Sequence, residues 1–562
     1  MSGWKINFAG LPLAGRPRGA PGTATSAGPT FSVFCLLSSV LRQSTVALCV
    51  GGCLLSAGCP RREAVVPAGQ VLRLSQRNEP ATLDPHLATL PDEFFIIRAL
   101  SEGLLTPGPD GGAPQPAVAE RWEISPDGRT YTFHLRPGAK WSNGDPVTAG
   151  DFVYSIQRAL SPALAAPKVA LFFPLRNAEA FSTGRLPDYS AVGVLAPGDH
   201  RLELTLEEPT ADFLAIVASG PWIPVHRATI EQFGRRDQRD TGWTRAGNFI
   251  GNGPFTLTAW RPNQEIIVQR NPAYWDAAEV RLPEIRFLAF DNGDAEERAF
   301  RAGQLDVTLS VPFTKILAYR AAQPPVLHQV LLHETRYLAL NMTRPPLDNP
   351  KVRYALALAL NRADLVEKVL LGGQQPALNF IPPGLGGYTP ATRLTEDAAE
   401  ARRLLGEAGF PEGRGFPKLE ITTWVGTPVL EAIQQMWRRE LGIEVTLAQR
   451  EARTHLAALA AGDYAIALVT AIPDYDGASD LFIDLRSGDP GNYPHWRNVE
   501  FDRLVAVAAR HAAYQQAEKV LLDDLPLIPL YFNSQNFLVQ PRVKHWQTDR
   551  IWTRFYRKVT VE

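Results

Sequence analysis

An alternation of strand and helix patterns between residues 419 and 468 constrains the fold of this chain more than any other stretch. Three short runs suited to strands are separated by two amphipathic runs with the 3.6-residue period of a helix. The expected elements are a strand at 419–424, a helix at 428–441, a strand at 443–447, a short helix ending at Gly462 and a strand at 464–469. Strands joined through helices form a parallel sheet with right-handed crossovers. The sequence therefore predicts an α/β fold.

The segment that follows the last of these strands is a candidate ligand site. Ligands of open α/β sheets bind beyond the carboxyl ends of the strands. Residues 470–475 occupy that place, and Asp474 is the charged side chain among them. The position favours a binding role for Asp474. The alternative interpretation is a solvated turn residue after a strand.

A second stretch predicts core structure rather than chemistry. Residues 131–136 alternate between apolar and polar side chains, which is the period of a half-buried strand. The turn residues at 126–128 are expected to pair this strand with another at 121–124. Thr148, with Asp151 three residues later, predicts a capped helix start. No catalytic group is indicated here.

The first 59 residues predict an export signal. They contain all four cysteines of the chain, and the first acidic residue is Glu63. A positive charge at Arg42 precedes an apolar run that ends at Ser56-Ala57-Gly58-Cys59, as in a secretory signal. Small residues directly before a cysteine resemble the processing site of bacterial lipoproteins, where the thiol is acylated. Cys59 is therefore the expected lipid attachment residue.

Two alternatives stay open for this segment. Val50-Gly51-Gly52-Cys53 is a second acylation site, which would make Cys53 the attached residue. Residues 31–55 are also long enough to cross a bilayer, which needs about 20 apolar residues. Arg42 in the middle of that run opposes a membrane-spanning helix, since a charge there costs a few kcal/mol. Translation is expected to begin near Val40 or Leu41, which would give a compact signal.

Composition excludes several classes of function. Four of the 57 basic residues and none of the 58 acidic residues lie in 1–59, which leaves the mature chain with a net charge of −5. Nucleic-acid binding relies on concentrated positive charge, so no nucleic-acid partner is expected. The sequence has no phosphate-binding glycine loop, no nucleophile elbow and no clustered histidines. We therefore expect no enzyme activity, no cofactor and no metal site.

The length of the mature chain predicts more than one lobe. About 500 residues are too many for a single hydrophobic core, so two or three lobes are expected.

Longer motifs, in order along the chain, resemble one family of bacterial proteins. The matching stretches include Glu79-Pro80-Ala81-Thr82-Leu83-Asp84-Pro85, Glu102-Gly103-Leu104-Leu105, Lys140-Trp141-Ser142-Asn143-Gly144-Asp145-Pro146, Asn252-Gly253-Pro254-Phe255, Asn271-Pro272-Ala273-Tyr274-Trp275 and Asp474-Tyr475. Their order and spacing are similar to those of the bacterial extracellular solute-binding proteins of family 5, which serve oligopeptide and dipeptide ABC transporters. The likeness covers residues 79–539. Phe152-Val153-Tyr154 with Gln157-Arg158 is most similar to the oligopeptide-binding branch.

The resemblance implies a two-lobed periplasmic binding protein of the class II type, with hinge-linked lobes and an additional subdomain on the first lobe. The expected segments are a leader with a lipoprotein processing site at 1–59, lobe I at 60–101, 225–335 and 529–562, the extra subdomain at 102–224, and lobe II at 336–528.

The resemblance also implies where a peptide would bind. A strand at about 87–91 is expected to pair with the peptide backbone, as is a strand segment of the other lobe, in the manner of strand addition. These segments contribute Thr89, Leu90 and Pro91 from lobe I, and Thr470, Ala471 and Ile472 from lobe II. Asp474, beside Tyr475, is expected to bind the α-ammonium group of the ligand. Tyr337 and Asn341 lie where the family places residues of the cleft.

Three departures from the family pattern affect this site. The family has a tryptophan two or three residues before the aspartate, whereas this chain has Ala471, Ile472 and Pro473 there. Pro473 lacks a main-chain donor. The arginine expected six residues before Asp474, which helps to hold the peptide carboxylate, is replaced by Leu468. Arg336 is a candidate substitute. A segment around 505–511 is also shortened. Peptide binding is thus supported at the amine end and unsupported at the carboxylate end.

The expected function is that of a substrate-binding lipoprotein without catalysis. It would capture oligopeptides in the cleft between its lobes and deliver them to the permease and ATPase complex of an ABC transporter in the inner membrane. The protein would be a monomer on the periplasmic side of the envelope, with a lipid anchor. Alternatives are the same fold binding another solute, such as a cell-wall peptide or a nickel complex, and an exported peptide or glycan hydrolase.

Overall fold

The computed structural model describes residues 70–506 and 511–562. The chain divides into two compact units, Met1–Ala64 and Val65–Glu562, and all described residues belong to the second. The predictions for residues 1–59, including those for Cys59 and Cys53, lie outside the described part. Within the described part, no helix combines the length and apolar character needed to cross a membrane.

One sheet joins the beginning of the described chain to a much later segment. Its strand order is β1-β10-β9-β8, with β1 and β10 parallel and the other neighbours antiparallel. The strands are β1 (Val71–Gln76), β8 (Phe255–Arg261), β9 (Glu265–Arg270) and β10 (Glu284–Ala289). Helix α1 (Pro91–Leu100) shares their core, in which Leu72, Ile96 and Phe287 are buried. This core fixes the turn before α1, which reaches the candidate site.

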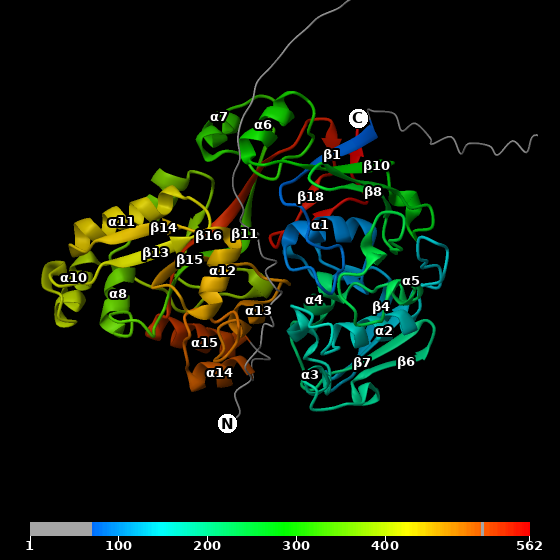
Figure 1. The fold of residues 1–562 in the computed structure, drawn as a ribbon, viewed down its shortest axis with the longest axis horizontal. Helices are drawn as coiled ribbons and strands as arrows, with labels where there is room; N and C mark the ends of the chain where they lie inside the picture. Colours follow the sequence, from blue (N-terminus) through cyan, green and yellow to red (C-terminus); the bar gives the residue numbers. More distant parts are fainter. Residues whose placement is uncertain (1–69, 507–510) are drawn as a thin grey trace, which may run out of the picture. The chain divides into compact units, whose positions relative to one another are not determined.

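A second, antiparallel sheet lies in the segment where an extra subdomain is predicted. Its order is β4-β5-β7-β6. The strands are β4 (Ala119–Ile124), β5 (Thr130–Leu135), β6 (Val194–Gly198) and β7 (Arg201–Thr205). The predicted pairing of β4 with β5 is confirmed, with Tyr131 and Phe133 buried. The predicted helix is α2 (Ala149–Ala159), which lies against this sheet in Figure 1. Asp151 Oδ2 accepts a hydrogen bond from the Thr148 main-chain nitrogen at 2.8 Å, completing the expected cap.

The third sheet has six strands in the order β12-β16-β11-β15-β13-β14 and contains the predicted 419–468 unit. The strands are β11 (Leu327–Leu340), β12 (Gln375–Pro376), β13 (Leu419–Thr423), β14 (Val445–Gln449), β15 (Ile466–Ala471) and β16 (Leu527–Leu538). Strand β13 is parallel to both β14 and β15, which confirms the predicted parallel unit. Strands β14 and β15 begin two residues later than predicted. Gly442 and Gly462 end the two helices, and after each glycine a short stretch of chain returns to the sheet before the next strand begins.

The two predicted helices of this unit are present as α11 (Pro428–Leu441) and α12 (Ala452–Ala461). The side chain of Thr427 accepts a hydrogen bond from the Val429 nitrogen and begins α11. Trp437 is fully buried, and its indole nitrogen donates to the Leu356 carbonyl oxygen at 2.8 Å. Gly442 ends α11 in the left-handed conformation, with a φ of 68°.

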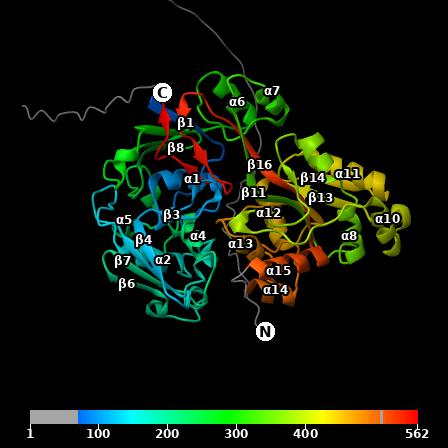
Figure 2. The ribbon, with the colours of Figure 1, turned by 180° about the vertical axis from the view of Figure 1, so that it is seen from behind.

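The two long strands β11 and β16 run side by side and antiparallel (Figures 1 and 2). Just beyond β16, Val539 bridges to Val307, which also bridges to Leu74 of β1. This path connects the third sheet to the first. The remaining helices are α3 (Ala178–Ser182), α4 (Phe213–Val217), α5 (Arg227–Phe233), α6 (Gly293–Arg301), α7 (Ile316–Arg320), α8 (Pro350–Leu358), α9 (Arg362–Asp364), α10 (Ala398–Glu407), α13 (Ala478–Ile483), α14 (Val499–Ala506) and α15 (His511–Asp524). Short strand pairs are β2 (Leu105–Thr106) with β3 (Gln115–Pro116), β17 (Val543–Lys544) with β20 (Thr560–Val561), and β18 (Gln547–Thr548) with β19 (Arg554–Phe555).

Candidate ligand-binding site

Asp474 lies in the loop between the end of β15 and the start of α13. Its main-chain nitrogen donates to Asp480 Oδ2 at 2.5 Å, so the first turns of α13 hold the loop in place. Its side chain forms an ion pair with the ammonium group of Lys168. Lys168 directly precedes the short 3₁₀ turn Val169–Phe172, in the segment of the second sheet. The side chains of Lys168 and Asp474 are 21% and 29% exposed, so the pair is mostly shielded from water.

Further carboxylates surround this pair. Burial opposes the charged form of Lys168, but the attraction of Asp474, Asp480 and Asp484 raises the pKa of Lys168 above its usual value. Burial, reinforced by repulsion from Asp474, holds the pKa of Asp480 well above its usual range. Burial and the neighbouring Asp489 raise the pKa of Asp484 to about 7. The loop and helix after β15 therefore form an acidic environment that favours a cation.

A cavity of about 130 Å³ brings together half of the predicted ligand residues, and we call it the Asp474 cavity. The predicted residues that line it are Thr89, Leu90, Pro91, Ile472 and Asp474. Lys168 and Arg98 line it as well. Two segments that lie far apart in the sequence, one before α1 and one after β15, thus border the same space.

The predicted strand at residues 87–91 is wrong. Residues 85–87 form a turn, and Pro91 is the first residue of α1. Glu93 Oε2 accepts hydrogen bonds from the main-chain nitrogens of Thr89 at 2.8 Å and Leu90 at 3.0 Å. These bonds cap the helix and use the donors that a strand would offer to a ligand. Proline at the first helical position favours the helix start, since its missing N–H would be unpaired there anyway.

Thr470 and Ala471 end strand β15, and Ile472 follows as an exposed residue. On one edge, Thr470 and Ala471 pair with Arg336 and Thr335 of β11. On the other edge, β13 pairs only with Ile466 and Ala467 of β15. Among the described strands, the last residues of β15 therefore have no strand partner on that side. This free edge can accept an extended backbone.

Tyr337 and Asn341 are not brought to this cavity. Tyr337 is buried on β11 and packs against Phe380 with ring centroids 5.5 Å apart. Asn341 is fully buried, and its side-chain nitrogen donates to the carbonyl oxygens of Gly462 at 2.9 Å and Tyr464 at 3.0 Å. Both residues support strands from the core.

Tyr475 is buried in the core of the second-sheet segment, which includes Phe213 and Trp222. Its hydroxyl group lies 2.8 Å from Ser479 Oγ, and that hydroxyl in turn donates to Asp212 Oδ2 at 2.5 Å. Asp212 precedes α4, whereas Tyr475 and Ser479 follow β15. The loop after β15 is thus anchored in the opposite part of the fold by packing as well as by hydrogen bonds.

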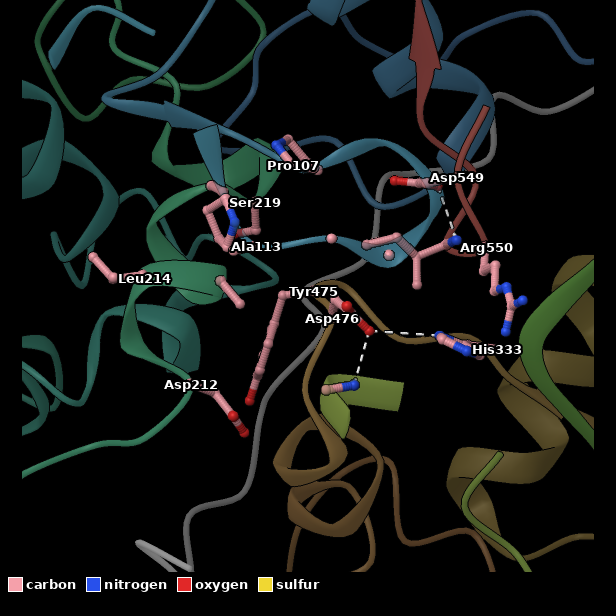
Figure 3. A pocket seen from close by; sticks show the side chains of 18 of the residues that line it. Pro107, Ala113, Asp212, Leu214, Ser219, His333, Tyr475, Asp476, Asp549 and Arg550 are labelled. Carbon is pink, nitrogen blue, oxygen red and sulfur yellow. Dashed lines mark hydrogen bonds and ion pairs between the residues drawn. The ribbon is translucent and has the colours of Figure 1, made fainter. Parts of the chain in front are cut away.

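A larger cavity of about 300 Å³ adjoins the first and shares Asp474 and Ile551 with it. Its lining includes four aspartates, Asp212, Asp474, Asp476 and Asp549, against one arginine, Arg550, and one histidine, His333, and we call it the acidic cavity. Figure 3 shows Asp212 and Tyr475 on one side, with His333 and Arg550 on the other. The sign of this lining favours cationic over anionic ligand groups.

Two carboxylates of the acidic cavity are fixed by main-chain donors. Asp476 Oδ1 accepts from the Gly386 nitrogen at 2.9 Å and lies 3.5 Å from His333 Nδ1 (Figure 3). Asp549 Oδ1 accepts from the nitrogens of Ile551 at 2.9 Å and Thr553 at 2.7 Å. Burial raises the pKa of Asp549.

No pattern in the sequence pointed to the basic residues near these cavities. Leu468, at the position of the family arginine, is buried. Arg336 forms an ion pair with Glu334 at 3.1 Å and lines neither cavity. Arg550 and Arg98 do line them, but each lies far from Asp474 in sequence and in no recognisable motif. Among the residues that the structure describes, no group of three or more histidine, cysteine or acidic side chains is placed to hold a metal ion.

Comparisons with known proteins identify the family. Residues 113–493 match the model of the bacterial extracellular solute-binding proteins, family 5. The chain is 33% identical over 515 residues to the probable deoxycholate-binding periplasmic protein YgiS of Escherichia coli K12, covering 89% of this chain and 94% of that protein. It is 32% identical over 535 residues to the periplasmic oligopeptide-binding protein OppA of the same organism, covering 90% and 96%.

Solved structures agree with this result. The structure of the murein tripeptide binding protein MppA of E. coli aligns with a TM-score of 0.79 at 31% identity, covering 88% of this chain and 99% of that chain. This likeness confirms the predicted two-lobed α/β fold. The relatives named here are periplasmic binding proteins. The chain belongs to family 5 of the bacterial extracellular solute-binding proteins.

Proposed function

We propose that this protein captures oligopeptides between its lobes and delivers them to the permease and ATPase complex of an ABC transporter. The observation that carries this proposal is the placement of Asp474. Its carboxylate borders a cavity lined by the segments that resemble peptide-binding segments of the family, and it binds an ammonium group, that of Lys168. A peptide α-ammonium group has the same chemistry as that lysine.

The free edge of β15 supplies the second support for a peptide. An extended ligand that adds to a strand edge gains main-chain hydrogen bonds that are largely independent of side-chain identity. Thr470, Ala471 and Ile472 offer such an edge next to Asp474. Tyr475, which lines the acidic cavity, would form one wall of the binding site. For the ligand carboxylate, Arg550 is the candidate partner, because it is exposed and is the one arginine on the lining of the otherwise acidic cavity.

Another solute in the same cleft is the second candidate function. Leu468 replaces the arginine that would hold a peptide carboxylate, and one relative is named as a probable deoxycholate-binding protein. A cell-wall peptide is a further candidate, since another relative is named as a murein tripeptide binding protein. A nickel complex and an exported hydrolase remain the less supported alternatives.

Native mass spectrometry of protein purified without refolding tests the ligand class directly. A retained mass that matches short peptides supports the proposal, whereas a retained sterol-like or metal-containing mass would favour another solute. Thermal unfolding with a peptide library provides the second measurement, since a ligand that binds only the folded state raises its stability. Intact peptides recovered after incubation would exclude a hydrolase, and cleaved peptides would support one.

We also propose that the protein is a lipoprotein anchored through Cys59. Small residues and an apolar run precede this thiol. Two or more acyl chains give stable anchoring, whereas one chain is marginal. The Cys59→Ser variant should lose labelled palmitate and leave the membrane fraction. Retention of both by Cys59→Ser, together with their loss in Cys53→Ser, would assign the lipid to Cys53 instead.

A further inference from the structure

The carboxylate proposed to bind the ligand amine already has a partner from the protein itself. Lys168 lies in the segment of the second sheet, and Asp474 follows the third sheet, so the ion pair spans two parts of the fold. Within the described residues, Asp474 has no other ion-pair partner. A ligand ammonium group and the Lys168 ammonium group would therefore compete for one carboxylate.

The surroundings favour keeping a cation at this place. Asp480 and Asp484 also attract Lys168, and the pair is mostly shielded from water. A partly shielded pair is less weakened by solvent and salt than a surface pair. Lys168 is thus a tethered cation at the amine position, which the protein carries at all times.

We propose that Lys168 determines specificity by competing with the ligand amine for Asp474. This inference rests on the proposed function. An amine-bearing peptide must displace Lys168 and gains only the difference between two similar ion pairs. A ligand without a charged amine leaves the ion pair of Lys168 and Asp474 intact and therefore loses little binding free energy. The ligand class therefore includes peptides with a blocked amino end, as well as peptides with a free one.

The competition has a measurable consequence in the ratio of two affinities. A buried charge pair that loses one partner weakens binding by about 2–5 kcal/mol, or about thirtyfold to several thousandfold. That penalty applies to an N-acetylated peptide only if Asp474 has no other cation. In the wild-type protein Lys168 supplies one, so the free peptide should bind less than about tenfold more tightly than its acetylated form.

Calorimetry with one peptide in free and N-acetylated form tests this on three proteins. Lys168→Met keeps most of the side-chain volume and removes the charge, so the preference for the free amine should rise to about thirtyfold or more. Lys140→Met is the matched control, because Lys140 is an exposed lysine of the same segment that forms no ion pair within the described residues, and it should behave as wild type. An equal preference in Lys168→Met and wild type would overturn the inference while leaving peptide binding intact.

A second measurement uses no ligand and separates this inference from the proposed function. If Lys168 and Asp474 pair in solution, either Lys168→Met or Asp474→Asn alone already breaks the pair. The melting-temperature shift of the double variant should therefore be smaller than the sum of the two single shifts. Additive shifts would overturn the pairing. Failure of both peptides to bind any of the proteins would instead overturn peptide as the ligand, while the thermal cycle still decides whether Lys168 holds Asp474.

Discussion

At the scale of single residues, a buried charge pair joins the turn before α1 to helix α2. Asp84 accepts two hydrogen bonds from the Arg158 guanidinium group, at 2.9 Å to Oδ1 and 2.5 Å to Oδ2. The same guanidinium group donates to His86 Nδ1 at 2.7 Å. All three side chains are buried. They join the turn before α1 to helix α2, and so hold Thr89 and Leu90 in place.

Removing one charge of this pair should strongly destabilise the protein. Asp84→Asn leaves the buried Arg158 without its counter-charge, and breaking a buried pair in this way costs about 3–5 kcal/mol. Urea unfolding should show a loss of that size. The exposed Asp199 offers the matched control, and Asp199→Asn should change the free energy of unfolding by less than about 0.5 kcal/mol. Similar losses in both variants would contradict the role of the buried pair.

His86 makes the same cluster sensitive to acid. Burial and the adjacent Arg158 lower the pKa of His86 from 6.5 to about 3. The unfolded chain therefore binds a proton between pH 6.5 and 3 that the folded protein does not bind, so stability falls as the pH falls through this window. The slope from one such group is at most about 1.4 kcal/mol per pH unit. Urea unfolding from pH 7 to 4 should show a shallower decline for His86→Gln, whereas exposed His200→Gln should follow wild type.

The residue scale also shows what could be predicted from the sequence. That Asp474 lines a cavity was predictable, because ligand sites of open α/β sheets lie beyond the carboxyl ends of parallel strands. Its partner Lys168 was not, because the two residues are 306 positions apart and meet only through tertiary structure. The core positions of Tyr337 and Asn341 were missed for the same reason. Whether these two side chains face a ligand or the core depends on which parts of the fold pack against β11 and the residue after it.

At the scale of secondary-structure elements, patterns in the local sequence correctly predicted the helices and strands that are stabilised by local interactions. Strand β5 and helices α2 and α11 follow from alternation, a capping box and a glycine stop, and all lie where expected. The strand expected at 87–91 was inferred from a resemblance alone. The structure has the start of a helix there instead, because Pro91 favours the first helical position and Glu93 caps the helix.

The glycine that ends α11 provides a test at this scale. Gly442 has a φ of 68°, and a Cβ atom there would lie 2.5 Å from the Glu412 carbonyl oxygen. Gly409 has a φ of 95° with no atom within 4 Å of its Cβ position. Gly409→Ala should cost about 1 kcal/mol for the left-handed backbone alone. Gly442→Ala should cost roughly 1–3 kcal/mol more, because the clash adds to it. Equal losses in urea unfolding would show that the chain relieves the contact.

At the scale of the whole described molecule, the loop after β15 links the parts of the fold that carry the second and third sheets. Lys168 contacts Asp474, the Ser479 hydroxyl donates to Asp212, and the Tyr475 ring is buried in the core beside Phe213. These contacts come from the segment that also lines both cavities. Binding in the cleft and contact between the lobes are therefore expected to stabilise each other, as in hinge closure around a ligand.

Tyr475 allows this coupling to be measured. Its ring is buried in the core of the opposite part of the fold, so Tyr475→Ala should favour the open protein and weaken ligand binding. Truncating a buried aromatic side chain costs about 3–5 kcal/mol, which sets the upper limit for the effect. Tyr475→Phe keeps the ring and loses only the hydrogen bond to Ser479, a change of about 1 kcal/mol.

Small-angle scattering and thermal unfolding with a binding peptide distinguish the three proteins. At a ligand concentration of about one hundred times the dissociation constant, wild type should become more compact and gain about 2.7 kcal/mol of stability. Tyr475→Phe should do nearly the same. At that same peptide concentration Tyr475→Ala should stay expanded and gain much less, because binding no longer recovers the energy of ring burial. If Tyr475→Ala closes as readily as Tyr475→Phe, the ring does not couple the lobes, and the coupling must come from the Lys168 and Asp212 contacts instead.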